Sequence, residues 1–406
     1  MSGQNIVHQE NKGKAYTILL FTGIVFIAFN LRPAITSVGP LIGTIRDDVG
    51  FSNWSVALLT SLPLIAFAIM SPIAPKLANR LSNERTLAFG LLVLIIGISL
   101  RSISVIFLLF LGTLFIGFGI AICNVLLPGV IKEKFPTKVA IMTSIYTSSM
   151  SIFATSASGV SVPLAEGLQL GWQLALFIWI IPAAIGLIIW TIIYRKNNIK
   201  SEEKMAFFEP DKGSGMWKAP LAWKVALFMG LQSSIFYITI SWLPEILMGY
   251  GMDKTTAGVM LSYFQFIGIP VSFIVPMIAV KMKSQSLLVL IVNTLYIIGV
   301  TCLIMNPSFV VTLIAIACIG TASSANFALA LSFLAIRARN AKQAAELSGM
   351  AQSIGYLLAA TGPIMIGFIY DLTQVWTIPL YLLIGITIVI IYFGMAAGQN
   401  KYVLDK

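Results

Sequence analysis

Charged residues are scarce in this sequence. Of its 406 residues, 10% are Asp, Glu, Lys or Arg and 58% are hydrophobic. Soluble domains carry about 25% charged residues. The apolar runs are long and continuous rather than alternating, which disfavours a β-barrel. The composition therefore predicts an all-α protein that crosses a membrane many times.

Histidine and cysteine are also rare. The single histidine, His8, lies in the polar N-terminal stretch, so neither an intramembrane histidine proton relay nor a zinc site is expected. Cys123, Cys302 and Cys318 all fall in apolar segments, where packing thiols are expected rather than disulfides or metal ligands. No metal or cofactor site is predicted.

Acidic residues are missing from the middle of the predicted spans. Of the fifteen Asp and Glu residues, Glu245 and Asp371 fall near outer ends and Glu346 near an inner start. Proton-coupled carriers usually titrate an intramembrane Asp, Glu or His. Coupling through a mid-membrane carboxylate is therefore disfavoured, whereas gating by Glu245 or Glu346, facilitated diffusion, exchange and proton movement with the substrate are left open.

Catalytic motifs are absent as well. The sequence contains no Walker-type phosphate loop, no nucleophilic triad and no metal cluster. An intramembrane enzyme or a sensor would need polar groups at depth or a sizeable soluble domain, so the protein is expected not to be an enzyme.

Twelve long apolar segments are present, enough for twelve transmembrane helices. They run over residues 16–45, 53–75, 86–104, 106–131, 139–163, 172–194, 221–247, 255–280, 286–305, 309–336, 343–369 and 376–397.

Basic residues predict the orientation of these spans. With the N-terminus inside, 22 of the 26 Lys and Arg residues fall on the inner side, and only Arg46, Arg101 and Lys254 fall outside. This asymmetry is typical of the positive-inside pattern. It predicts two cytoplasmic termini in a plasma (inner) membrane, and it explains the net charge of +11 without a nucleic-acid partner.

The chain divides near its middle. Residues 195–220 are polar and basic and predict a cytoplasmic linker, with a short surface helix near Glu202. A shift of about 204 residues brings Ser144 onto Ser348 and Asn124 close to Asn326, as expected of two parallel repeats. We therefore expect two pseudo-symmetric six-helix bundles, residues 1–194 and 221–406.

Arg32 is the most unusual residue of the first span. It lies about 27 Å along a helix from Lys14 and about 21 Å from Arg46, and thus near mid-membrane. Pro33 removes a helix donor, so the backbone beside it is expected to open. A guanidinium at this depth needs a polar cavity or a partner. Arg32 either contacts an anionic or strongly dipolar substrate or pairs with helix carbonyls or a carboxylate.

The loop after the second span carries a family signal. Residues 75–85 read PKLANRLSNER and resemble the Gly-x-Leu-Ala-Asp-Arg-x-Gly-Arg-Arg motif of the major facilitator superfamily. Arg80 and Arg85 fit the motif, and the resemblance implies a gating role for Asn79, Arg80 and Arg85. The usual Asp is Asn79 here, so the ion pair assigned to that Asp is not implied.

A closer resemblance covers most of the chain. Residues 30–33 (NLRP), 345–356 (AELSGMAQSIGY, continuing through Gly362 and Pro363) and 242–244 (WLP) are similar to the cyanate/2-nitroimidazole transporters of that superfamily. The resemblance implies a monomeric transporter in the lipid bilayer that moves a small anionic or polar solute, such as a cyanate- or nitro-type compound, by alternating access around Arg32. The alternative is a multidrug or toxic-compound efflux pump.

Other polar residues within apolar spans complete the predicted substrate site. Each buried amide or hydroxyl needs a partner, which can be a neighbouring helix or the ligand. Besides Arg32, the candidates are Asn30, Asn124, Tyr237, Gln265, Asn326, Gln352 and Tyr356. Gln232 is a further polar residue within an apolar span that could share the cavity.

Overall fold

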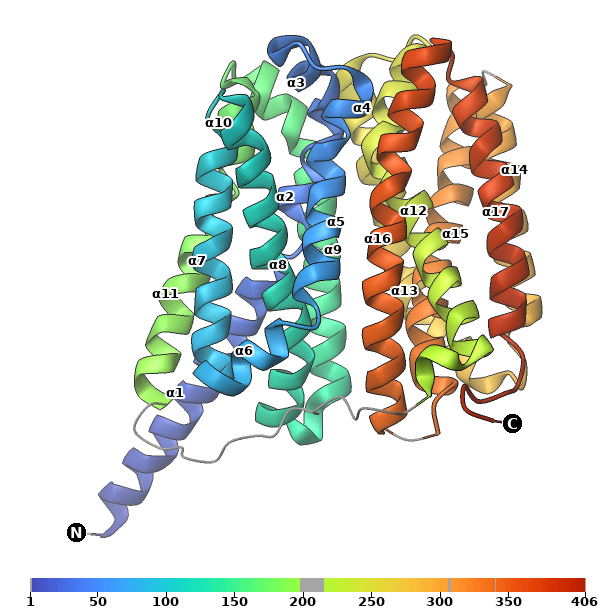
Figure 1. Ribbon diagram of the computed structural model, residues 1–406. Helices are drawn as coiled ribbons and strands as arrows, with labels where there is room; N and C mark the ends of the chain where they lie inside the picture. The colour runs from blue at the N-terminus through green and yellow to red at the C-terminus, as the bar shows by residue number, and fades with distance from the viewer. Residues whose placement is uncertain (1, 198–214, 306–307, 340, 406) are drawn as a thin grey trace.

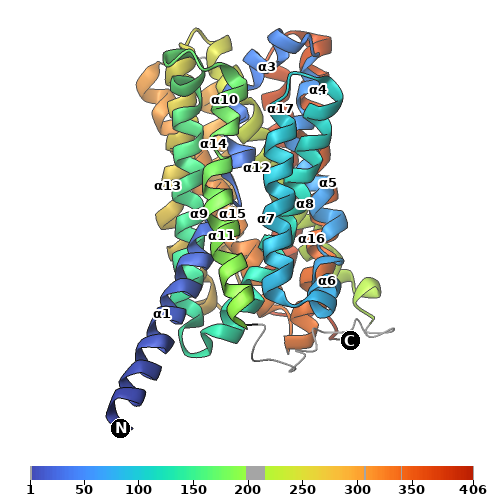
Figure 2. The same ribbon diagram turned by 90° about the vertical axis from the view of Figure 1, so that its left-hand side faces the viewer.

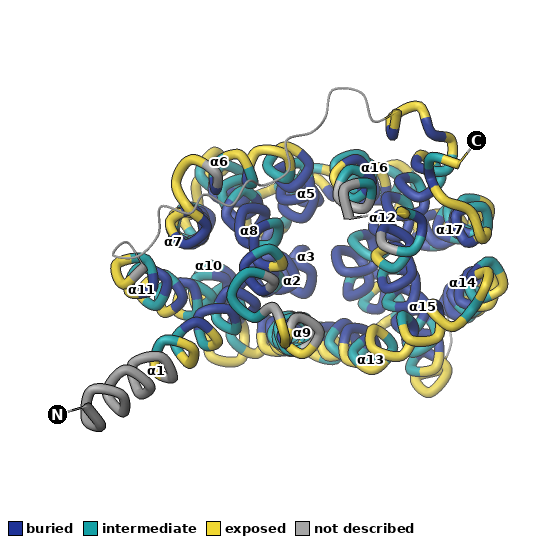
Figure 3. Tube along the Cα trace, turned by 90° about the horizontal axis from the view of Figure 1, so that it is seen from below, coloured by how far each residue is buried: buried dark blue, intermediate teal, exposed yellow. Residues whose placement is uncertain are grey.

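The computed structural model describes the chain except for residues 1, 198–214, 306–307, 340 and 406 (Figure 1). Within the described residues every regular element is a helix. Two groups of helices stand side by side and separate clearly when the molecule is viewed along their axes (Figure 3). This arrangement agrees with the predicted all-α fold.

The N-terminal bundle contains the helices up to α11. Pro136–Lys138 and Pro163–Gly167 form short turns within it. The helices are α1 (Ser2–Ala28), α2 (Pro33–Thr36), α3 (Ile42–Val49), α4 (Asn53–Val56), α5 (Leu58–Met70), α6 (Ala74–Leu81), α7 (Asn83–Arg101), α8 (Ile106–Lys134), α9 (Val139–Val162), α10 (Gly171–Phe177) and α11 (Ile180–Asn197), with the single turn η1 (Gly39–Leu41) between α2 and α3.

The C-terminal bundle is more regular, with six long helices. They are α12 (Pro220–Gly249), α13 (Lys254–Lys281), α14 (Ser286–Ile304), α15 (Phe309–Ile336), α16 (Ala341–Thr373) and α17 (Thr377–Ala397). The surface helix predicted near Glu202 lies outside the described residues. The linker boundaries, residues 195–220, stay a prediction.

Eleven helical segments in the described chain are long and apolar enough to cross a membrane. The remaining predicted span, over residues 139–163, corresponds to α9, which runs alongside these helices in Figure 2. Ten of the 24 residues of α9 are Ser or Thr, so its low apolarity has a clear origin. The bundles thus account for the twelve predicted spans.

Both chain ends lie at one face of the molecule, below the bundles in Figure 1, which we call the terminal face; the other is the distal face. The bundles meet where α16 packs on α4 and α5, where α13 packs on α9, and where α12 packs on η1. These contacts place the mid-height of α2, α9, α12 and α13 around the axis between the bundles.

Candidate functional site

The first span is interrupted where the sequence predicts an opened backbone. Helix α1 ends at Ala28, and α2 starts again at Pro33. Proline suits a first helical position because the N–H it lacks would have no partner there. The break leaves Arg32 at the start of α2 with φ −130°, so its side chain leaves the helix axis towards the other bundle.

A second arginine stabilises this break. The Val38 N–H bonds to the Ile35 carbonyl, and Arg101 Nη1 donates to the Ala34 carbonyl at 2.5 Å. The Arg101 side chain is 1% exposed at the end of α7, although the sequence placed it outside the membrane. Arg101 therefore holds the backbone two residues after Arg32, a role that the sequence pattern did not indicate.

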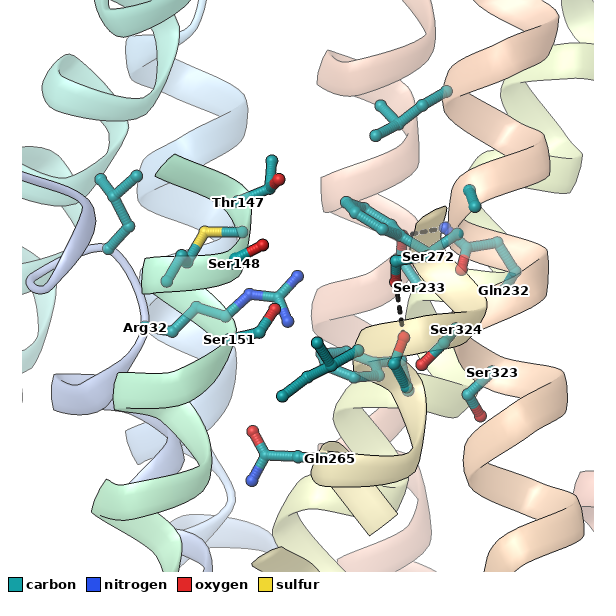
Figure 4. Close-up of a pocket in the computed structure, with 18 of the residues that line it drawn as sticks. Arg32, Thr147, Ser148, Ser151, Gln232, Ser233, Gln265, Ser272, Ser323 and Ser324 are labelled. Atoms are coloured by element: carbon teal, nitrogen blue, oxygen red, sulfur yellow. Dashed lines mark hydrogen bonds between the residues drawn. The ribbon is translucent and has the colours of Figure 1, made fainter. Parts of the chain in front are cut away.

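A cavity of about 360 Å³ lies between the bundles beside Arg32. Small-molecule sites are commonly about 300–1,000 Å³. Polar side chains gather on both of its walls, as Figure 4 shows. The N-terminal bundle contributes Arg32, Asn124, Thr147, Ser148 and Ser151, and the C-terminal bundle contributes Gln232, Ser233, Gln265, Ser272, Ser323, Ser324, Ser332, Tyr237 and Tyr356.

The Arg32 guanidinium projects into this cavity without a polar partner. Among the described residues it has no hydrogen bond or ion pair, and the cavity-lining residues described include no Asp or Glu. Its charge faces two aromatic rings, with the guanidinium carbon 5.3 Å from the centre of Phe236 and 5.6 Å from that of Phe327. Such contacts attract a cation but leave its N–H donors unused.

Five of the predicted site residues line the cavity together. They are Arg32, Asn124, Tyr237, Gln265 and Tyr356. Arg32 and Asn124 belong to the N-terminal bundle and the other three to the C-terminal bundle, so the predicted set spans both walls.

Three predicted residues have other partners. Asn30 donates to the Phe26 carbonyl at 2.6 Å, and Gln352 donates to Ser348 Oγ at 2.8 Å. Asn326 exchanges two hydrogen bonds with Asn293, at 3.0 and 2.9 Å, between α15 and α14. None of the three is among the lining residues of the cavity, and their contact with substrate stays a prediction.

Several lining residues were missed by the sequence analysis. Thr147, Ser148 and Ser151 form a hydroxyl-bearing wall on α9, and Ser323 lines the cavity from the other bundle. Gln232, named from the sequence, also lines it. The high Ser and Thr content of α9 is the signal that could have identified this wall, because lipid-facing helices seldom need so many hydroxyls.

At the distal face, charged and amide groups join the two bundles; we call this set the distal seam. Arg46 Nη1 lies 3.1 Å from Glu245 Oε2. Asp371 accepts from the Asn53 side chain at 2.6 Å and from the backbone N–H groups of Asn53 and Trp54 at 3.1 and 3.0 Å. Lys254 pairs with Glu166. The distal seam comprises Arg46, Asn53, Trp54 and Glu166 of one bundle and Glu245, Lys254 and Asp371 of the other.

Glycines bring the backbones together beneath the distal seam. A Cβ on Gly39 would collide with the Ile240 carbonyl oxygen of α12, and one on Gly43 would collide with the Glu245 carboxylate. On the other bundle, a Cβ on Gly367 would lie 2.6 Å from the Asn53 carbonyl. Small residues permit such close helix contacts. Ser241 also bonds to Thr60 across the interface at 2.8 Å, so this half of the interface is closed.

The cavity extends instead towards the terminal face. Its lining reaches Pro276, five residues before the end of α13, and Ser332, four before the end of α15. Among the described residues, each ion pair at this face joins groups of one bundle: Lys134 with Glu84 and Glu133, and Arg339 with Asp405.

Burial disfavours the charged form of Lys134, but its bonds to Glu133 and Glu84 outweigh this effect, so the pKa of Lys134 is raised. Of the predicted gating residues nearby, Arg80 is exposed and Arg85 lies 4.5 Å from the centre of the Tyr194 ring. The side chain of Asn79 lies outside the described part of the structure.

Two helical bundles around a polar cavity, which contacts between the bundles close at the distal face, define a membrane transporter rather than an enzyme. The Major Facilitator Superfamily profile matches residues 19–363, and the chain belongs to that superfamily.

Its relatives extend over nearly the whole chain. It is 47% identical to the uncharacterized transporter YycB of Bacillus subtilis (strain 168), over 98% of both chains. It is 38% identical to the 2-nitroimidazole transporter of Escherichia coli (strain K12), over 95% of this chain and 96% of that relative. The cyanate transport protein CynX of the same strain is 23% identical, over 94% and 99%. The resemblance stated from residues 30–33 and 345–356 is thus confirmed.

Solved structures agree on the fold. A bacterial homolog of the human lysosomal transporter Spinster superposes with a TM-score of 0.73 at 15% identity, covering 94% of this chain and 97% of that one. The nucleoside transporter NupG gives 0.72 at 15% identity, covering 94% and 98%.

Proposed function

We propose that this transporter carries a small, flat solute with an anionic or strongly dipolar group, which Arg32 binds in the central cavity. The observation that supports this most is the unpaired guanidinium of Arg32. A buried cation without a counter-charge is costly, and an anion or a nitro group would supply the missing acceptors. The same cation disfavours positively charged drugs.

The walls of the cavity support a flat aromatic substrate. Phe67, Phe236, Phe264 and Phe327 line it, and aromatic faces stack on planar ligands. The relative at 38% identity is a 2-nitroimidazole transporter. 2-Nitroimidazole is a planar ring with a dipolar nitro group. A nitro-heteroaromatic compound therefore suits both the charge and the shape of this cavity.

Transport would proceed by alternating access between the two bundles. The protein would lie in the plasma membrane with both termini in the cytoplasm. In that orientation the cavity opens towards the cytoplasm, and the distal seam closes the outer side. Opening outwards would break the distal seam and bring the terminal ends of the bundles together, where Asn79, Arg80 and Arg85 would form the inner gate. The protein would act as a monomer.

Flux into liposomes tests this proposal. Purified protein would be reconstituted and the uptake of 2-nitroimidazole and of cyanate measured. The matched variants are Arg32→Ala, Arg32→Lys, and Arg195→Ala, which removes an exposed arginine at the end of α11. We expect the wild type and Arg195→Ala to transport at least one compound, Arg32→Ala to lose that flux, and Arg32→Lys to retain part of it.

Two outcomes would contradict the proposal. Equal flux through folded Arg32→Ala and wild type would make Arg32 a structural residue. Transport restricted to bulky cationic compounds would favour the multidrug efflux alternative.

A further inference from the structure

We propose that the substrate also carries a hydrogen-bond donor, such as a ring N–H, and that a buried amide oxygen of the C-terminal bundle, that of Gln232 or of Gln265, accepts from it while Arg32 binds the acceptor end. This inference rests on the proposed function of Arg32. It makes the cavity a polarised site, with donors on one wall and acceptors on the other.

The orientation of the Gln265 amide follows from its partner. Ser158 Oγ lies 3.2 Å from each of two carbonyl oxygens, those of Thr36 and Ala154, so its single proton is engaged there. Ser158 can therefore only accept from Gln265, which donates through Nε2 at 2.5 Å. The opposite end of the amide, Oε1, must then be the oxygen.

This Gln265 oxygen has no partner. It is buried and forms no hydrogen bond among the described residues, and Gln265 as a whole is 8% exposed. In Figure 4 the oxygen lies on the side of the amide nearer to Arg32, and the nitrogen lies on the far side.

Gln232 repeats the arrangement on α12. Its Nε2 donates to the Met229 carbonyl at 3.1 Å and to Ser233 Oγ at 2.8 Å. A carbonyl cannot donate, so the nitrogen is assigned and Oε1 is again the free end. That oxygen is buried and has no partner in the part of the chain that the structure describes, and Gln232 as a whole is 1% exposed.

The wall thus offers unused hydrogen-bonding groups on three helices, α12, α13 and α15. Ser323 Oγ, also lining the cavity, is a third buried group without a partner in the described chain. Buried acceptors are almost always satisfied in folded proteins. The cavity places Arg32 opposite them, so a ligand N–H is the group that would complete this wall while a nitro or anionic group occupies the other.

A pair of ligands that differ only in the donor tests the inference. 2-Nitroimidazole has a ring N–H, and 1-methyl-2-nitroimidazole has none. Dissociation constants would be measured by calorimetry on detergent-purified wild type, Gln232→Met, Gln265→Met and Gln173→Met. Gln173 bonds to Ser104 at the distal face and serves as the control.

We expect the wild type and Gln173→Met to bind 2-nitroimidazole at least about tenfold more tightly than 1-methyl-2-nitroimidazole, because the methyl group leaves the buried acceptor unpaired. Gln232→Met, Gln265→Met or both should reduce this ratio towards one. The ratio is the decisive quantity, since a change in conformation would weaken both ligands together.

Equal affinity of the two ligands for the wild type, or a ratio that persists in both cavity variants, would overturn the inference. If the ratio is one but Arg32→Ala still weakens both ligands, the proposed function stands and only this inference fails. If neither compound binds the wild type, this inference fails, and the proposed function then depends on an Arg32-dependent flux of cyanate.

Discussion

The distal seam and the central cavity use partly buried charge in opposite ways. In the distal seam, Arg46, Glu245 and Asp371 all have partners on the other bundle. In the cavity, Arg32 faces two aromatic rings of the other bundle and has no polar partner among the described residues. The difference teaches that paired charges hold the bundles in one arrangement, whereas the unpaired charge is available to a ligand.

The positions of glycine residues differ between the distal seam and the cavity in the same way. Gly39 and Gly367 let the backbones touch beneath the distal seam, whereas side chains of Ser, Thr and Gln keep the walls of the cavity apart. A closed seam and an open cavity along one interface are what a carrier needs if a rocking motion exchanges them.

Among the substitutions considered, Asp371→Asn is expected to have the largest effect, by opening the distal seam. Asp371 accepts three hydrogen bonds from the other bundle, and losing its charge should weaken the closed seam by about 3 kcal/mol, or more than about 100-fold in the equilibrium. The distance between spin labels at Val105 and Val375, exposed in the distal loops, would report the opening. Asp48→Asn is the control, since Asp48 pairs with Trp172 within the N-terminal bundle; an equal shift in both variants would refute the claim.

Gly39→Ala should open the same face through sterics alone. The added methyl meets the Ile240 carbonyl of α12, which cannot move without the helix, at a cost of about 2 kcal/mol. The spin-label distances should lengthen, whereas Gly385→Ala, which meets no atom within 4 Å, should leave them unchanged. Unchanged distances in Gly39→Ala would show that the contact does not hold the bundles.

Arg101→Met tests whether the broken helix positions Arg32. It leaves the Ala34 carbonyl without its donor, and we expect ligand affinity to fall about fivefold, or about 1 kcal/mol. Arg101→Lys, which can still donate, should restore part of the affinity. Calorimetry on folded protein would measure both, and a loss of thermal stability with unchanged affinity would contradict a positioning role.

Asn326→Leu is expected to have the smallest effect on the ligand. It should lower the unfolding temperature, because Asn293 loses its buried partner, yet leave the dissociation constant unchanged. The double variant Asn293→Leu with Asn326→Leu should recover much of the stability. Weaker ligand binding in both the single and the double variant would instead support the substrate contact predicted for Asn326.

The sequence predicted the long helices and the opened backbone at Pro33 because apolar length and proline act locally. It also identified Arg32, since a mid-depth cation is rare in any span. It could not separate Asn124, which lines the cavity, from Asn326, which pairs with Asn293, because both are amides within apolar runs. The distal seam was also hidden, since Arg46 and Glu245 meet only after the bundles pack.

The central claim is that Arg32 binds the substrate, and calorimetry on the wild type, Arg32→Ala and Arg32→Lys with 2-nitroimidazole tests it most directly. The account predicts that Arg32→Ala, with an unfolding temperature close to that of the wild type, loses affinity by about 10- to 100-fold, and that Arg32→Lys loses less. Equal affinity in all three proteins would contradict it and leave Arg32 as part of the helix break alone.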